Sequence, residues 1–228
     1  MIHEVTMTGK PSLRTTLTFL SDLKENNERT WFAQHRDEYD AARQAFEDFL
    51  DEIIDPLRGS DNLQFLRAKD CISRIYRDIR FSKDKTPYKI NMGAMIAPGG
   101  WKSDVLGYYV SVQPGGESMV AGGLYSPSSE QLLSFRKMVD RDAAKFKALV
   151  SEPAFAKAFG KIEGDSLKTA PRGFEKDHPE IELLRLKQIF AWRKYSDADV
   201  LADGFTQDVI KKCNILRPFL RYLQEVIA

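Results

Sequence analysis

Three short β-rich segments in the middle of the chain limit its possible folds more than any other feature. Residues 90–97, 106–113 and 117–124 are rich in tyrosine, valine, isoleucine and methionine, and glycine and proline separate them. Pro114-Gly115-Gly116, between the second and third segments, is typical of a β-hairpin turn. We therefore expect an antiparallel meander of three or more strands.

Helical patterns precede the meander. Leucines at three-residue spacing in residues 17–23 indicate a short amphipathic helix that ends at Asn26-Asn27. A longer apolar stripe follows over residues 32–57, with the three-, four- and seven-residue spacings of a helix packed on a core. We expect this second helix to end at Pro56-Leu57-Arg58-Gly59, because proline and glycine interrupt helices.

Helical patterns also follow the meander. Pro127-Ser128-Ser129 predicts a helix start with a capping serine, and Asp177-His178-Pro179 predicts a second start. Residues 209–223 form the apolar face of a last helix. The order predicts an α+β fold, an antiparallel sheet packed against N-terminal and C-terminal helices. We interpret residues 1–12 as a tail and residues 13–228 as a single α+β domain.

The composition favours a cytoplasmic protein. Hydrophobic residues make up 43% of the chain and charged residues 29%, an ordinary globular mixture. The two cysteines, Cys71 and Cys213, lie in apolar stretches outside any CxxC motif, so we expect both to stay reduced and unpaired. The first residues lack a signal-peptide pattern, and no stretch approaches the roughly 20 apolar residues that span a bilayer. We therefore expect no membrane association.

Charge is concentrated in one segment. The whole chain has a net charge of +1, which argues against a surface that coats nucleic acid or an anionic membrane. Residues 67–89, however, contain eight basic and three acidic residues, a net charge of +5. Like charges at this density repel one another unless acidic groups or a bound anion offset them. The segment is therefore the first place to look for function.

The local conformation of this basic segment is ambiguous at residues 71–81, whose apolar positions fit either a strand or a helix. We favour a strand. A strand would place the even-numbered side chains from Arg74 to Arg80 on one face and turn Arg77 toward the core. The following residues 82–87 have short polar side chains and a proline, as in a rigid turn.

The same segment carries a family resemblance. RIYRDIRFSKDKTPYK, residues 74–89, resembles the signature of a widespread family, domain of unknown function 2461. The resemblance runs from about Leu13 to Ile227 and implies one continuous domain, but it carries over no activity, catalytic residue or cofactor. The other matching pieces are residues 26–32, 122–127, 167–174 and 177–179.

Our first functional hypothesis is a binding site for a phosphate- or carboxylate-bearing ligand. Arginine binds both groups through paired, charge-assisted hydrogen bonds. In the opposing structural interpretation, these charges pair within the segment or with the acidic helix end at residues 47–55. The candidate ligand-binding residues are Arg74, Arg77, Arg80, Lys83, Lys85, Tyr88, Lys89, Lys168, Arg172 and His178.

Two other hypotheses stay open. An enzyme of hydrolase or phosphoryl-transfer type would use Asp78, Asp84 and His178. No P-loop, GxSxG or HExxH motif is present, and the three histidines lack metal-ligand spacing, so we expect no metal site. A protein-interaction module would instead use tyrosines on an open sheet face, namely Tyr108, Tyr109 and Tyr125.

A nucleic-acid partner is a less favoured variant of the first hypothesis. It would need Tyr76, Tyr88 or Trp101 to be exposed beside the basic residues, because exposed rings stack on bases. The near-neutral net charge counts against it. The sequence specifies neither a cofactor nor an oligomeric state.

Overall fold

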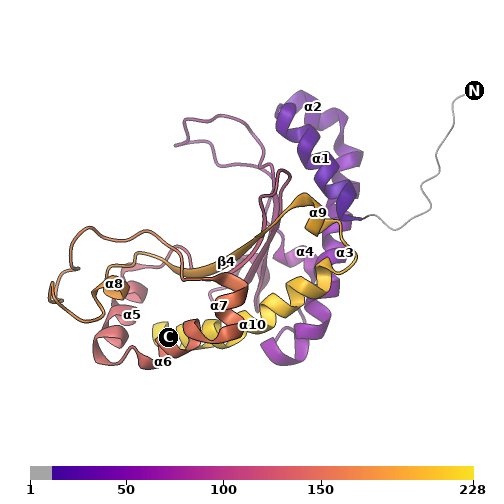
Figure 1. Cartoon of the computed structure of the whole chain (residues 1–228). Coiled ribbons are helices and arrows are strands. Elements are labelled where there is room, and N and C mark those ends of the chain that lie inside the picture. The colour runs from indigo at the N-terminus through magenta and orange to yellow at the C-terminus, as the bar shows by residue number, and fades with distance from the viewer. Residues whose placement is uncertain (1–11) are drawn as a thin grey trace, which may run out of the picture.

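The computed structural model describes residues 12–228, which form one antiparallel sheet together with helices that precede and follow it in the chain (Figure 1). The predicted N-terminal tail, residues 1–12, lies outside the described residues except for Ser12. The interpretation of residues 13–228 as one domain stays a prediction. The first four helices are α1 (Leu13–Glu25), α2 (Arg29–Gln34), α3 (Arg36–Asp61) and α4 (Ala68–Cys71).

The sheet has the strand order β1-β2-β3-β4 with every neighbouring pair antiparallel. The first three strands confirm the predicted meander and the hairpin at Pro114–Gly116. The fourth is not predicted by the sequence, in which only helical patterns are recognised after the meander. The strands are β1 (Met92–Ile96), β2 (Tyr108–Val112), β3 (Ser118–Leu124) and β4 (Ile189–Tyr195).

The remaining helices complete the α+β fold. Ser128 caps α5 as expected: its side chain accepts from the Gln131 amide, and the Gln131 side chain accepts from the Ser128 amide. These helices are η1 (Gly100–Lys102), α5 (Ser129–Arg141), α6 (Ala144–Ser151), α7 (Pro153–Phe159), α8 (Ile181–Leu184), α9 (Asp197–Val200) and α10 (Phe205–Ile227).

Helix α10 packs closely against one face of the sheet. A Cβ atom on Gly122 in β3 would lie 3.1 Å from a methyl of Leu220 and 3.3 Å from one of Leu216, so glycine permits this approach. Most of the buried apolar side chains form one cluster that includes Phe46 of α3 and Val110 of β2. The sheet is thus anchored on the α10 side. None of the helices within residues 12–228 combines the length and hydrophobicity needed to cross a membrane.

Two helix boundaries differ from the prediction. The helix expected over residues 32–57 is interrupted at His35 and continues through Pro56 to Asp61. Ile53, Ile54 and Leu57 are fully buried, and this packing holds the last turns helical despite the proline. The helix predicted to start at Asp177-His178-Pro179 is only the single turn of α8.

Both cysteines are free and buried, as expected. Burial raises the pKa of the Cys71 thiol to about 12 and raises that of Cys213 as well, so neither forms a thiolate at neutral pH. We expect Ellman's reagent to label less than one thiol per chain under native conditions within minutes, and two after denaturation. Rapid labelling of either cysteine in the native protein would show that the thiol is accessible and would contradict its burial.

Candidate functional site

The basic segment is extended but forms no regular strand. Cys71 ends α4, and the chain then pairs through the isolated bridges Ile72↔Ala94 and Tyr76↔Tyr88. The even-numbered side chains from Arg74 to Arg80 are exposed, whereas Ile75 is buried and Arg77 is half-buried. The alternation expected for a strand is therefore present, although the strand itself is reduced to two bridges.

Several basic side chains of the segment bind acceptors within it. Arg77 Nη1 donates to the Asp84 carboxylate and to the Thr86 hydroxyl. Arg80 binds Asp78 with an Nη2–Oδ2 distance of 2.6 Å. Lys85 Nζ donates to the carbonyl oxygen of Ile79 at 2.9 Å. These contacts close the 77–87 loop on itself, as the structural interpretation of the charge cluster anticipated.

The same contacts keep the two carboxylates of the loop ionised. Hydrogen bonds from the Arg80 side chain and amide lower the pKa of Asp78 to about 2. The Thr86 amide, followed by the Arg77 guanidinium, lowers the pKa of Asp84 to about 2. A general acid or base works best with a pKa near the operating pH, so these carboxylates are poorly suited to that role at neutral pH.

Tyr88 is not available to a ligand, because it packs into the fold. It is buried, and its ring stacks on Phe32 of α2 with centroids 4.1 Å apart. Asn27 holds its backbone: the Tyr88 amide donates to Asn27 Oδ1 at 3.0 Å, and Asn27 Nδ2 donates to the Tyr88 carbonyl at 3.1 Å. Tyr88 thus anchors the end of the loop to the α1–α2 connection.

A groove of about 1130 Å³ begins where the basic segment leaves α4. Arg74 and Lys102 line it together with two exposed aromatic side chains, Phe65 and Trp101. Asp70 also lines the groove, but Arg67 binds its carboxylate through two hydrogen bonds of 2.6 and 3.1 Å. The negative charge in the groove is therefore already neutralised.

Lys89 lies next to this groove. Its Nζ is 5.5 Å from the centroid of the Trp101 ring and donates to the Ser73 hydroxyl at 3.0 Å. Burial, together with the nearby charge of Arg74, lowers the pKa of the Lys89 ammonium. An anion at this position would be attracted by both charges.

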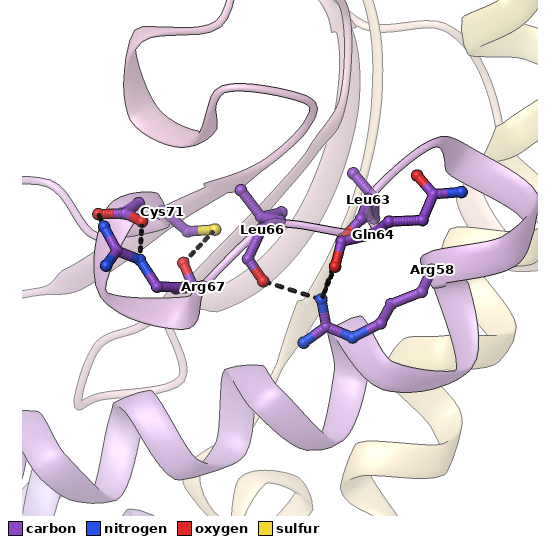
Figure 2. A network of polar contacts seen from close by, with 7 residues as sticks. Arg58, Leu63, Gln64, Leu66, Arg67 and Cys71 are labelled. Atoms are coloured by element: carbon purple, nitrogen blue, oxygen red, sulfur yellow. Dashed lines mark hydrogen bonds and ion pairs between the residues drawn. The ribbon is translucent and has the colours of Figure 1, made fainter.

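The connection between α3 and α4 forms one rim of the groove and is held by Arg58 (Figure 2). Arg58 Nη1 donates to the carbonyl oxygens of Leu63 at 3.0 Å and Leu66 at 2.9 Å, with a longer contact of 3.4 Å to Gln64. Asn62 ends α3 in the left-handed conformation. These contacts fix the backbone on both sides of the exposed Phe65.

A second groove, of about 930 Å³, lies on the sheet beside the first. Side chains of β1, β2, β3 and β4 line it, among them Met95, Tyr109 and Trp192. Trp101 lines both grooves and is their common wall. Trp101 thus separates the groove that carries Arg74 from the groove on the sheet.

The C-terminal candidates are not brought to this site. Lys168 and Arg172 are exposed in the 160–180 loop, which lies beside α5 and α8, whereas the 77–87 loop projects near α1 and α2 (Figure 1). His178 Nδ1 accepts from the Glu180 amide at 3.0 Å, and its Nε2 is 3.4 Å from Asp140 Oδ1. His178 therefore stabilises the turn before α8. Asp78, Asp84 and His178, the three residues of the enzyme hypothesis, line neither of these two grooves.

The match to a protein family covers most of the chain. Residues 15–222 match the model of the family described as "Conserved hypothetical protein (DUF2461)". The chain belongs to the DUF2461 family. No curated protein matches it, and no solved structure does. In this DUF2461 protein, two of the segments that carried the resemblance, residues 26–32 and 74–89, meet at the Asn27–Tyr88 hydrogen bonds.

Lys102, Trp192 and Asn27 are among the residues of this DUF2461 site that the sequence does not single out. Lys102 could have been suspected from its place beside Trp101, and Trp192 from the aromatic residues of residues 189–195. The role of Asn27 has no local signal, since its partner is 61 positions away. No group of three or more His, Cys, Asp or Glu side chains arranged to hold a metal ion occurs in the part of the chain that the structure describes.

Proposed function

We propose that the protein binds a small anionic ligand, bearing phosphate or carboxylate, in the groove lined by Arg74 and Lys102. The proposal is based on which basic side chains are paired with carboxylates and which are not. Arg67, Arg77 and Arg80 are each held by a carboxylate of the same segment. Arg74 and Lys102 form no ion pair within residues 12–228, and both line the groove.

The proposed site is smaller than the set of residues suggested by the sequence. Arg74 supplies the guanidinium fork, which matches phosphate and carboxylate geometry. Lys89 adds a partly buried charge at the edge, and Lys102 adds one from η1. Each charge-assisted contact of this kind is worth about 1.5–3 kcal/mol when the partner is ionised. Three such groups suffice for a specific but reversible anion site.

We expect Arg74→Gln to weaken binding of inorganic phosphate or pyrophosphate about 10- to 100-fold, because one charge-assisted contact is lost. Isothermal titration calorimetry on the purified chain measures this directly. Lys83→Gln is the matched control: it removes the same charge from an exposed position of the same segment that lines neither groove. If both variants lose the same amount of phosphate affinity, the anion is attracted by the overall positive charge of the segment and not by a specific site. If the wild type does not bind phosphate or pyrophosphate, the proposal is wrong.

A further inference from the structure

The groove that contains Arg74 has apolar as well as charged walls. Its lining includes Ile72, Pro98 and Trp101. Trp101 is 43% exposed, and Ile72 and Pro98 are half-buried. An inorganic anion would leave these apolar surfaces in water, whereas an organic anion could cover them, and burying apolar surface is favourable. The groove therefore matches an anion that carries an apolar group better than it matches a bare one.

One wall of the groove is an extended stretch of the basic segment. The chain is extended at Ile72, which bridges to Ala94 of β1. Ile72 and Arg74 are two positions apart, so their side chains point to the same face, and both line the groove. Two residues of extended chain span about 6.6 Å. The apolar and the charged side chain of this wall are thus separated by close to the width of one aromatic ring.

A second wall is a turn that depends on glycine. Gly99 and Gly100 have φ angles of +90° and +67°, in the left-handed region that favours glycine. A Cβ atom on Gly100 would overlap the Asp70 carbonyl oxygen, so the turn packs directly against the backbone of α4. Trp101 and Lys102 follow at once in η1, and both line the groove. The turn therefore sets the position of one aromatic ring and one cation.

Lys89 lies between the guanidinium and the aromatic ring. Its Nζ is 5.5 Å from the centroid of the Trp101 ring. Burial, followed by the nearby charge of Arg74, lowers the pKa of the Lys89 ammonium, so Arg74 is close as well. An anion held by Arg74 and Lys89 would therefore place its organic group beside Trp101.

We propose that the ligand of this site is a phosphate monoester of a single aromatic ring, with its phosphate at Arg74 and its ring against Trp101 and Ile72. This inference rests on the proposed function, since Arg74 must first hold the anion. The three cations Arg74, Lys89 and Lys102 offset a phosphate dianion better than they match a singly charged carboxylate. Aromatic rings that pack on one another gain affinity beyond the apolar area they bury.

The test is calorimetric titration of the full chain at about pH 8, where phosphate monoesters carry close to two negative charges. The probes are phenyl phosphate, methyl phosphate, cyclohexyl phosphate, phenol and benzoate. We expect phenyl phosphate to bind about 5- to 30-fold more tightly than methyl phosphate, because only the former buries a ring. Cyclohexyl phosphate should bind about two- to tenfold more weakly than phenyl phosphate, because its ring is not flat.

Variants of Trp101 locate the ring. Trp101→Ala and Trp101→Leu should each bring the affinity for phenyl phosphate close to that for methyl phosphate. The leucine variant keeps an apolar side chain, so the test stands even if Trp101→Ala does not fold. Phe81→Ala is the control, because this ring is 96% exposed in the same basic segment and lines neither groove. If the Trp101 variants keep the preference for phenyl phosphate, or if Phe81→Ala loses it, the ring binds elsewhere and the inference is wrong.

The probes separate this inference from the proposed function. If phenyl and methyl phosphate bind equally and Arg74→Gln weakens both, the anion site stands and the aromatic ligand is wrong. If cyclohexyl phosphate binds as tightly as phenyl phosphate, the groove selects apolar volume and not an aromatic ring. If benzoate binds more tightly than phenyl phosphate, the site is one for carboxylates and the phosphate is wrong. If phenol binds as tightly as phenyl phosphate, the anion site itself fails.

Discussion

Replacing Asp61 with alanine should lower the free energy of unfolding by about 3–5 kcal/mol, the cost of breaking a largely buried ion pair from one side. Asp61, at the end of α3, accepts hydrogen bonds of 2.7 and 3.0 Å from Arg217 of α10. It also accepts one of 2.9 Å from the Tyr108 hydroxyl of β2. The Asp61 and Arg217 side chains are only 12% and 18% exposed. Chemical denaturation followed by circular dichroism measures the change.

The expected loss comes from the partners left behind in Asp61→Ala. The Arg217 guanidinium and the Tyr108 hydroxyl would both lose a buried acceptor, and unpaired buried groups cost more than the bond itself contributed. Asp55→Ala is the matched control on the same helix. Asp55 pairs with Arg58, but its side chain is 68% exposed, and surface pairs contribute little.

A double variant identifies the mechanism. Arg217→Met in the Asp61→Ala background removes the charge that Asp61→Ala leaves unpaired, so part of the lost stability should return. No recovery in the double variant would mean that the loss arises from packing at the α3–α10 contact. If the free energy of unfolding of Asp61→Ala lies within about 1 kcal/mol of the wild-type value, the Asp61–Arg217 pair is not buried in solution.

The sequence predicted those parts of the fold that depend on local pattern. Alternation and the Pro114–Gly116 turn were enough to find β1 to β3, because neighbouring strands pair through a short hairpin. The sequence does not predict strand β4, because its partner β3 lies more than 60 residues earlier in the chain. In addition, Arg193 and Lys194 within the strand interrupt its apolar pattern. Residues Ile189 to Tyr195 become a strand because β3 offers them an edge.

The site was predicted only in part for a similar reason. Charge density marks residues 67–89 as unusual, but it does not say which charges are neutralised. That depends on the turn at residues 82–87, which brings Asp84 back to Arg77, seven positions earlier. The proposed C-terminal contribution from Lys168, Arg172 and His178 needed the relative placement of distant segments, which no local pattern contains. Trp101, in contrast, is exposed beside Lys89, as the nucleic-acid variant of the hypothesis required.

Replacing Asn27 with alanine should lower the free energy of unfolding by about 2–3 kcal/mol, because both backbone groups of Tyr88 lose their partner. Asn27 acts here as a strand would, since its amide side chain both accepts from and donates to the Tyr88 backbone. Hydrogen exchange gives a local readout: the Tyr88 amide should exchange at least tenfold faster in the variant. Asn26→Ala is the control, because Asn26 is exposed and its side chain donates to the Asp22 carbonyl of α1, not to the loop.

The Asn27→Ala variant also tests how the anion site is positioned. The bond at Tyr88 immediately precedes Lys89, whose amide donates to the Ile75 carbonyl at 2.8 Å, one residue after Arg74. If the Tyr88 backbone becomes more mobile, the positions of Arg74 and Lys89 are no longer fixed. The affinity for phosphate should then fall, although neither charge has been removed. If stability falls but phosphate binds as in the wild type, Asn27 only anchors the loop. If the Tyr88 amide keeps its protection, the ring stack on Phe32 holds this end of the segment without the asparagine.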